Sequence, residues 1–334
     1  MVISKTPFRI SFFGGGTDYP VWYNEHPGAV LSTTIDKYCY ITARHLPPFF
    51  DYKFRVRYTQ REETLSIEEI KHPSVKACLS FLNEDNSLNN GVEIAHNSDL
   101  PACTGMGSSS AFTVGLLHAL YALKGQIIAQ RALALNAIHV EHNIIKEHVG
   151  SQDQVAAAMG GLNRIDFSSI DININPLTLK ASRIKELQQH LLLFFTGFTR
   201  IASDIAAVQI SQTKDRTTEL SQMYQLVDEA IKILSTETDI TTFGKLLHQT
   251  WLLKRSLTNR ISTTDIDNIY DKALSAGALG GKLLGAGGGG CILFFVTPEK
   301  QPEVINALKP LLLIPFAFET QGSQIIYYDP HGDI

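Results

Sequence analysis

Residues 100–123 read LPACTGMGSSSAFTVGLLHALYAL, a run of glycines and serines that leads directly into an apolar stretch. The apolar part has the length of a helix, which we expect to extend from about Ser109 to Lys124. Glycines let the backbone approach an anion closely, and the free N–H groups at a helix start point toward it. Serine hydroxyls add hydrogen bonds or a Mg²⁺ ligand. The segment therefore predicts a phosphate-binding loop.

Two further segments combine glycine with small residues, and each adjoins an apolar run. They are Gly14–Asp18, which reads GGGTD, and Gly285–Gly290, which reads GAGGGG. One such segment alone is most simply a tight turn or a close backbone contact, because glycine loses much conformational entropy on folding. Three of them in one chain favour a polyanionic ligand.

Other glycine-rich motifs do not fit. A Walker A loop would need glycine at Ala276 ahead of Gly281-Lys282, and Ser or Thr after the lysine. A nucleophile elbow would need glycine where Ala111 follows the three serines. No G-x-G-x-x-G follows a strand with an acid in the right place, so a nicotinamide site is poorly supported.

The composition is that of an ordinary globular protein. Hydrophobic residues make up 44% of the 334 residues and charged residues 19%, which argues against disorder and suggests two domains or one large one. The net charge is −4, from 29 basic and 33 acidic residues. We therefore expect no nucleic acid partner and no binding to an anionic membrane surface.

Neither a membrane span nor a targeting segment is expected. The longest stretch without Asp, Glu, Lys or Arg, Leu100–Leu123, is interrupted by Pro101 and is rich in glycine and serine. Arg9 breaks the apolar start before a signal peptide could form. The cysteines lie far apart without a C-x-x-C pair, so we expect buried free thiols, no zinc and a cytoplasmic protein. They are Cys39, Cys78, Cys103 and Cys291.

The pattern of apolar residues predicts an α+β protein of two domains, 1–180 and 181–334, with more helix in the second. Strands are expected at 7–13, 28–46, 54–58, 91–100, 160–167, 171–177, 190–198 and 291–296. Helices are expected at 109–124, 129–149, 203–235, 242–257 and 264–276. A closing hairpin of 315–318 and 325–328 is expected around Gly322.

One carboxylate falls on the apolar side of the helix expected at 129–149. Glu141 is flanked by Ile138 and Ile145, one turn away on either side. A carboxylate there must be paired, hydrogen-bonded or metal-bound. A salt bridge to a distant arginine and a Mg²⁺ ligand are equally compatible with the pattern.

A second acid, Asp153, lies where a turn enters a helix. Acids in the first turn of a helix are common and often only stabilise it. Beside a phosphate loop and a candidate metal ligand, however, such an acid could orient or deprotonate a hydroxyl nucleophile.

Taken in order, the three glycine segments resemble those of the GHMP kinase family, which includes galactokinases and homoserine, mevalonate and phosphomevalonate kinases. The matching stretches are PFRISFFGGGTDYP (7–20), PACTGMGSSSA (101–111) and KLLGAGGGGC (282–291). Met106 replaces the usual leucine. The resemblance, which extends from about Lys5 to Tyr328, implies a two-domain fold with the active site in the interdomain cleft, and ATP and Mg²⁺ as cofactors.

Within the family, the chain is most similar to bacterial D-glycero-D-manno-heptose 7-phosphate kinases. The stretches that indicate this are PFRISFFGGGTD, VEHNIIKEHVGSQDQVAAAMGGLNRIDF (140–167) and LLLFFTGFTRIASDI (191–205). That likeness implies phosphorylation of the anomeric hydroxyl of a heptose 7-phosphate to the 1,7-bisphosphate. A kinase for fucose or galactose, and a sensor that binds sugar and ATP without catalysis, are the alternatives.

The resemblance also implies roles for individual residues. Asp153 matches the catalytic acid, and Arg9 lies where many members have a basic residue near the transferred phosphoryl group. Arginine stays protonated and cannot act as a base. The metal ligands would be Ser109 and Glu141. The ATP phosphates would be held by Gly105, Gly107, Ser108, Ser109 and Ser110. The sugar would be bound by Gly15, Gly16, Thr17 and Asp18. The loop that closes over the site would bring Gly287 and Gly288 to the substrate.

No motif identifies the site for the second phosphate of such a sugar. Arginines suit it because a guanidinium pairs with phosphate through two hydrogen bonds. Our preferred candidate is Arg200, after the strand expected at 190–198. The others are Arg44, Arg55, Arg57 and Arg164.

Overall fold

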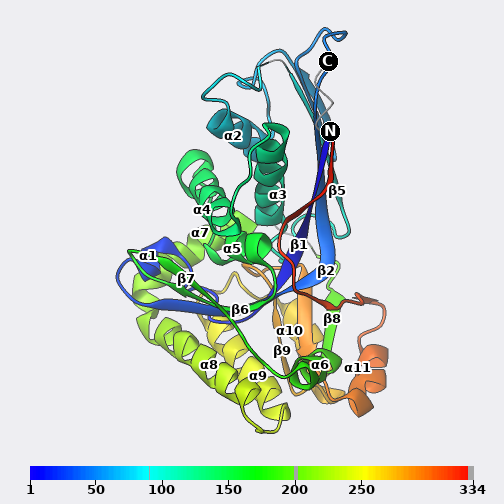
Figure 1. Ribbon diagram of the computed structural model, residues 1–334. Coiled ribbons are helices and arrows are strands. Elements are labelled where there is room, and N and C mark those ends of the chain that lie inside the picture. The colour runs from blue at the N-terminus through cyan, green and yellow to red at the C-terminus, as the bar shows by residue number, and fades with distance from the viewer. Residues whose placement is uncertain (90, 199–201, 330–334) are drawn as a thin grey trace.

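The computed structural model describes residues 1–89, 91–198 and 202–329, and one long antiparallel strand pair runs through it (Figure 1). The pair consists of β1 (Val2–Phe13) and β2 (Gly28–His45). In a strand, successive side chains point to opposite faces. In β1, Arg9 and Ser11 therefore share one face, and Phe8 and Ile10 share the other.

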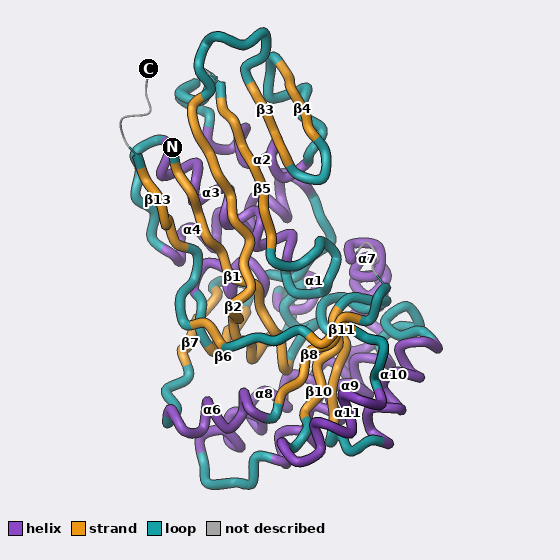
Figure 2. The backbone as a smooth tube through the Cα atoms, turned by 90° about the vertical axis from the view of Figure 1, so that its right-hand side faces the viewer, coloured by secondary structure: helices purple, strands orange, loops and turns teal. Residues whose placement is uncertain are grey.

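The strand pair is the centre of a nine-stranded sheet that Figure 2 shows almost face on. Its main order is β13-β1-β2-β5-β3-β4, while β12 and β6 also pair with β2, and β7 pairs with β6. The other strands are β3 (Phe54–Arg57), β4 (Arg61–Thr64), β5 (Val92–Ser98), β6 (Leu162–Phe167), β7 (Ile172–Pro176), β12 (Phe318–Glu319) and β13 (Gln324–Tyr328).

Helices cover one face of the upper part of this sheet (Figures 1 and 2). They are α2 (Pro73–Leu82), α3 (Ser108–Leu123), α4 (Gln130–His139) and α5 (Gln152–Met159), and the short α1 (Pro20–Tyr23) follows the first glycine segment. A π-helical turn, Val140–Ile145, continues α4. Most of α3 is buried, because it packs on β1 and β2 and is itself covered by α2, α4 and α5.

The second part contains a four-stranded sheet in the order β11-β8-β10-β9 and most of the remaining helices. Its strands are β8 (Leu191–Phe195), β9 (Gly280–Leu283), β10 (Cys291–Phe295) and β11 (Leu312–Leu313). Its helices are α6 (Ala181–Gln189), α7 (Ala202–Gln212), α8 (Thr217–Ser235), α9 (Thr241–Ser256), α10 (Thr264–Ser275) and α11 (Gln301–Ala307), with 3₁₀ turns at Thr213–Arg216 and Pro298–Lys300.

An aromatic cluster joins the two parts. Phe243 of α9 is fully buried and packs edge-on against Phe12 and Phe13 of β1, with ring centroids 5.6 and 5.1 Å apart. It also lies 6.1 Å from the ring of Phe295 in the second sheet. The end of β1 is therefore held in a core shared by both parts, and the first glycine segment begins directly after it.

The α+β architecture is confirmed, but three expected elements are wrong. The helix expected at 129–149 ends at the π-helical turn, because Lys146 adopts a left-handed conformation with φ 62°. The helix expected at 203–235 is divided by the 3₁₀ turn at Thr213–Arg216. The two segments of the closing hairpin do not pair with each other, since β12 pairs with β2 and β13 pairs with β1.

These last two strands return from the C-terminal end of the chain to the first sheet, so the sheets do not divide completely at residue 180. Of the four cysteines, Cys39, Cys78 and Cys291 are buried as expected, whereas Cys103 is exposed, because it lies in the loop before α3. Across residues 1–89, 91–198 and 202–329, no helix has the length and apolar character required to cross a bilayer.

Replacement of Phe243 by alanine should reduce the free energy of unfolding by about 3–5 kcal/mol, because it leaves a cavity in the shared core. The measurement is urea unfolding followed by circular dichroism. Leu252→Ala is the control, since Leu252 lies on the same helix with 44% of its surface exposed and should change stability by less than about 1 kcal/mol. Similar losses in both variants would show that the aromatic cluster does not join the two parts.

Candidate active site

A cavity of about 850 Å³ lies between the two parts of the molecule. Its wall includes β1, the loop before α3, and the starts of α3 and α5 from the first part, and α7, α9 and the third glycine segment from the second. A volume of this size suits a ligand as large as a nucleotide. The cavity lies at the interdomain position where the active site is expected.

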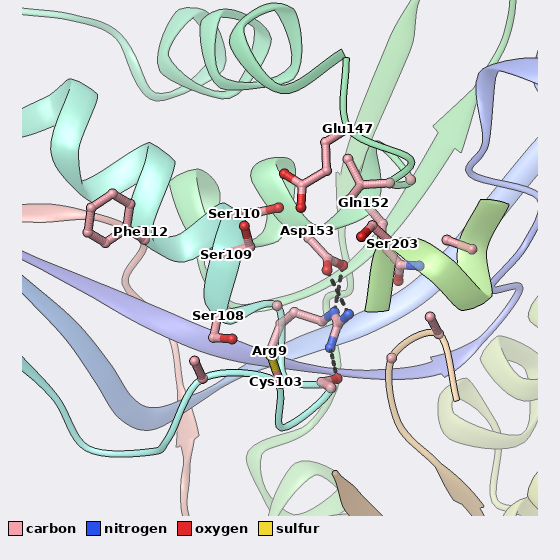
Figure 3. Close-up of a pocket in the computed structure, with 18 of the residues that line it drawn as sticks. Arg9, Cys103, Ser108, Ser109, Ser110, Phe112, Glu147, Gln152, Asp153 and Ser203 are labelled. Atoms are coloured by element: carbon pink, nitrogen blue, oxygen red, sulfur yellow. Dashed lines mark hydrogen bonds and ion pairs between the residues drawn. The ribbon is translucent and has the colours of Figure 1, made fainter. Parts of the chain in front are cut away.

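The start of α3 forms one side of the cavity. Gly107 precedes the helix in a left-handed conformation (φ 73°) that strongly favours glycine, and no side chain caps the helix. The first N–H groups of a helix have no partner inside the helix. Ser108, Ser109 and Ser110 occupy this first turn and line the cavity (Figure 3). The turn therefore offers N–H and hydroxyl donors to an anion.

The second and third glycine segments touch through their backbones. A Cβ atom on Gly105 would lie 2.5 Å from the Leu284 carbonyl oxygen, and one on Gly285 would lie 2.5 Å from the Gly105 Cα atom. The Cys291 N–H donates a hydrogen bond of 2.8 Å to the Thr104 carbonyl. Contacts this close exclude side chains at both glycines, so the third segment packs directly on the loop before α3.

An ion pair connects β1 to the start of α5. Arg9 donates from Nε to Asp153 Oδ1 at 2.7 Å and from Nη2 to Asp153 Oδ2 at 2.8 Å (Figure 3). Its third nitrogen donates to the Gly105 carbonyl at 2.7 Å. The Arg9 side chain is 5% exposed and that of Asp153 is 22% exposed, so the carboxylate is the part that faces the cavity. A Cβ on Gly107 would lie 3.3 Å from both side chains.

Asp18 is the second carboxylate of the cavity wall. Its Oδ1 accepts from the Gly16 N–H and its Oδ2 from Gln152 Nε2, both at 2.9 Å. A Cβ on Gly150 would lie 1.9 Å from Asp18 Oδ2, so only glycine fits beside it. Burial raises the pKa of Asp18, and the nearby charge of Asp153 raises it further.

Glu141 is fully buried, as its position on the apolar helix face predicts. Its Oε2 accepts hydrogen bonds from Ser110 Oγ (2.9 Å) and from Gln154 Nε2, while Oε1 has no partner among the described residues. Burial raises the pKa of the carboxyl to about 7. Within the part of the chain that the structure describes, Glu141 forms neither the salt bridge considered from the sequence nor a bond to Ser109.

The surroundings of Glu141 fit a magnesium ion that is held mainly by nucleotide phosphates. Mg²⁺ usually takes one or two carboxylates and keeps the rest of its shell for water and phosphate oxygens. The unpartnered Oε1 of Glu141 is such a carboxylate oxygen, and the neighbouring serine hydroxyls are further neutral oxygen donors. Another carboxylate, Glu147, lines the cavity itself, and burial raises its pKa. Among the described residues, no group of three His, Cys, Asp or Glu side chains could hold a metal without such help.

Sequence reasoning missed two buried lysines in the wall. Lys254 Nζ donates to the carbonyls of Leu283 (2.9 Å) and Gly285, and Lys282 Nζ donates to the Phe12 carbonyl at 2.9 Å. Burial lowers the pKa of Lys254 to about 7 and that of Lys282 far below its ordinary value, and the charge of Arg9 acts in the same direction. Lys282 directly precedes LLGAGGGG, and this position is the only feature of the sequence that indicates it could belong to the site. No feature of the sequence indicates Lys254.

The far end of the cavity is aromatic, which the sequence also did not reveal. His72 stacks on Phe112 with centroids 4.8 Å apart, and His96 packs edge-on against the same ring at 5.0 Å. Burial lowers the pKa of both histidines. Flat, uncharged rings of this kind can hold a nucleobase.

The structure brings most of the expected site residues together. Those that line the cavity are Arg9, Gly15, Gly16, Asp18, Gly105, Gly107, Ser108, Ser109, Ser110 and Asp153. Thr17, Gly287, Gly288 and Glu141 do not line it. The Thr17 hydroxyl instead donates to the Gly14 and Ala29 carbonyls, and the Gly288 N–H donates to the Ile261 carbonyl.

Four of the arginines considered for a second phosphate have other partners. Arg44, Arg55 and Arg57 surround Glu93, with N–O distances of 2.6, 3.3 and 3.0 Å. Arg164 is ion-paired with two aspartates. None of these four lines the cavity. Arg200, the preferred candidate, lies outside the described residues.

Comparison with known proteins adds two matches to family models. Residues 73–161 match the N-terminal domain of GHMP kinases, and residues 226–310 match the C-terminal domain of GHMP kinases. Together these ranges cover more than half of the chain, and between them they include α3, α5, α9 and the third glycine segment.

Individual relatives agree with these matches. A D-glycero-alpha-D-manno-heptose 7-phosphate kinase from Campylobacter jejuni is 29% identical over 314 residues, which are 92% of each chain. A galactokinase from Pyrococcus furiosus is 26% identical over 95% of each chain. The crystal structure of a D-glycero-D-manno-heptose 1-phosphate kinase from Bacteroides thetaiotaomicron superposes with a TM-score of 0.81 over 98% of this chain and all of the other, at 24% identity, which indicates a shared fold.

The buried Glu141 predicts a measurable pH dependence of stability. Between its ordinary pKa of 4.5 and its folded value of about 7, the folded protein binds more protons than the unfolded chain. The free energy of unfolding should therefore fall as the pH rises through this window. In Glu141→Gln this contribution is absent. As the pH rises from 5 to 8, the free energy of unfolding of the variant should therefore increase by about 2–3 kcal/mol relative to that of the parent protein.

The measurement is chemical unfolding of both proteins at several pH values in the presence of EDTA. Glu229→Gln, an exposed site on α8, is the control and should leave the pH profile unchanged. A constant difference between Glu141→Gln and the parent protein at every pH would contradict the raised pKa.

Proposed function

The chain belongs to the GHMP kinase family and is an ATP-dependent phosphotransferase, and from this premise we propose that it phosphorylates the anomeric hydroxyl of D-glycero-D-manno-heptose 7-phosphate. The product would be the 1,7-bisphosphate. The choice of sugar is supported by the heptose 7-phosphate kinase of Campylobacter jejuni, whose similarity extends over 92% of both chains.

The observation that carries the proposal is the Arg9–Asp153 pair beside the start of α3. Asp153 Oδ2 lies close to Gly107, the residue that precedes the anion-binding turn. An acceptor hydroxyl that donates to this carboxylate would be directed at a phosphate bound to that turn. Arg9, held between Asp153 and Gly105, would offset the negative charge that develops during transfer.

We assign the ATP phosphates to Gly105, Gly107 and the three serines, and the base to the aromatic end of the cavity. The start of α3 supplies the N–H donors, and Phe112 lies four residues into the same helix with His72 and His96 around its ring. One helix would therefore align both ends of the nucleotide.

We assign the sugar to the wall formed by Gly15, Gly16 and Asp18. Each oxygen of Asp18 accepts one hydrogen bond from the protein, which leaves lone pairs for sugar hydroxyls. Thr17 would act indirectly by fixing the shape of this wall, because its hydroxyl bonds to the backbone of Gly14 and Ala29. Gly287 and Gly288 contact the backbone of Ile261 and would act only by fixing the third glycine segment.

We propose Ser109 and Glu141 as the protein ligands of magnesium. When bound, the ion neutralises phosphate charge. Glu141 reaches the first turn of α3 through the hydrogen bond from Ser110, and its Oε1 is buried without a partner among the described residues.

The alternative is a kinase for a neutral sugar such as galactose. It is favoured by the galactokinase of Pyrococcus furiosus, which matches over 95% of both chains. A neutral acceptor would use the same Asp18 and Asp153 and would need no site for a second phosphate.

In ³¹P NMR with Mg·ATP, D-glycero-D-manno-heptose 7-phosphate should give a new anomeric phosphate signal, and galactose and fucose should give none. Asp153→Asn should retain ATP affinity but lose roughly 10²–10⁴-fold in rate, because an amide cannot replace the oriented carboxylate. A signal only from a neutral sugar would favour the alternative. No signal from any sugar would refute sugar phosphorylation.

The two carboxylates near α3 are distinguished by a magnesium titration. Glu141→Ala should raise the Mg²⁺ concentration needed for half-maximal turnover by about tenfold or more, by analogy with the loss of a metal-site group. Glu147→Ala, the matched control, should leave it unchanged. The opposite result would transfer the metal-binding role to Glu147.

A further inference from the structure

Two side-chain oxygens of the cavity wall, one from Ser11 and one from Gln152, are buried without a hydrogen-bond partner among the described residues. They are Ser11 Oγ and Gln152 Oε1, and the side-chain amide of Gln209 lies in the same wall, next to Gly16. The three residues are 5%, 8% and 6% exposed, and all line the cavity. Buried polar groups in folded proteins are nearly always hydrogen-bonded, so these unpartnered oxygens call for an explanation.

All three converge on Gly15 and Gly16. A Cβ on Gly15 would lie 3.8 Å from Gln152 Nε2 and 3.9 Å from Ser11 Oγ. A Cβ on Gly16 would lie 2.8 Å from Gln209 Nε2. The absence of side chains at these two glycines therefore leaves the three polar groups around one short stretch of backbone.

The elements that carry them place this cluster next to the reacting centre. Ser11 follows Arg9 by two residues on the same face of β1. Gln152 begins α5 and directly precedes Asp153 (Figure 3). Gln209 comes from α7, in the second part of the molecule. The cluster thus spans the interdomain cleft beside the ion pair.

The hydrogen-bonding capacity of the cluster indicates its ligand. Gln152 Nε2 donates to Asp18 Oδ2, so the amide is fixed with its oxygen as a free acceptor. Asp18 contributes further acceptor sites, and Ser11 and Gln209 can both donate and accept. A phosphate, which only accepts, would face acceptors here.

We propose that Ser11, Gln152 and Gln209 form with Asp18 a subsite that recognises hydroxyl groups of the acceptor adjacent to the reacting one. This inference rests on the proposed function and specifies how its acceptor is chosen. The subsite selects a polyhydroxylated ring over acceptors with an isolated hydroxyl, because each missing hydroxyl leaves buried polar groups unpaired.

The test combines protein variants with substrate analogues. Steady-state kinetics are measured for the parent protein, Gln152→Met and Gln209→Met, with D-glycero-D-manno-heptose 7-phosphate and its 2-deoxy and 3-deoxy analogues. Each variant should lose about 10–100-fold in kcat/KM for the full sugar. With the one analogue that lacks the hydroxyl bound by the replaced residue, the variant and the parent protein should have similar kcat/KM values. The KM for ATP should stay constant in all cases.

The matched control is Gln212→Met. Gln212 lies on the same helix as Gln209, and its Oε1 is also buried without a partner, but it does not line the cavity. It should leave kcat/KM unchanged for every sugar. Ser11→Ala should behave like the glutamine variants, with Ser32→Ala on the neighbouring strand as its control. Equal losses with all analogues, or no loss at all, would overturn the proposal.

Failure of the proposed function can be recognised separately. If the heptose is not phosphorylated, saturation-transfer NMR of the same variants with heptose 7-phosphate and with galactose still reports binding. Loss of sugar binding in Gln152→Met and Gln209→Met but not in Gln212→Met would support the subsite for a different acceptor. Absence of binding of both sugars to the parent protein would refute it.

Discussion

The bidentate pair between Arg9 and Asp153 is the interaction on which the rest of the site depends. The pair joins β1 to α5, the helix after the π-helical turn. The third nitrogen of Arg9 donates to the Gly105 carbonyl and holds it in place. Removing one partner from a buried pair leaves an uncompensated charge, which typically costs about 3–5 kcal/mol. A Cβ atom on Gly107 would lie within 3.4 Å of both side chains. The pair therefore also limits where the first turn of α3 can lie.

The glycines around this pair are contacts rather than flexible joints. Gly105 and Gly285 meet backbone to backbone, and Gly150 leaves room for the carboxylate of Asp18. Each position would clash with a single added carbon, and interiors as dense as those of proteins transmit such clashes. The glycine-rich segments therefore place three distant parts of the chain at separations that no side chain would permit, and the cavity is the space that remains in front of them.

The sequence was sufficient for what depends on local pattern or on a specific motif. The α+β class, the buried position of Glu141 and the convergence of Arg9, Asp18 and Asp153 all follow from periodicity or from the family resemblance. Partners distant in the sequence were beyond it. Nothing local shows that the strand at 324–328 pairs with the start of the chain, or that Lys254 reaches the third glycine segment. These contacts exist only once the two parts have packed together.

The environments of the two cavity carboxylates suit them to different tasks. Asp153 accepts two hydrogen bonds from a guanidinium that does not give up its proton, so its charge is offset and its orientation fixed. Asp18 forms no ion pair with any of the described residues. It accepts hydrogen bonds from an amide and a backbone N–H, and its burial raises its pKa. A carboxylate held through both oxygens by a guanidinium is a good anchor for an acceptor hydroxyl. In phosphoryl transfer through a loose transition state, the acceptor proton need not leave early. Under the proposed function, this geometry suits Asp153 to orientation and charge compensation, and Asp18 and the side chains around it to recognition of the acceptor.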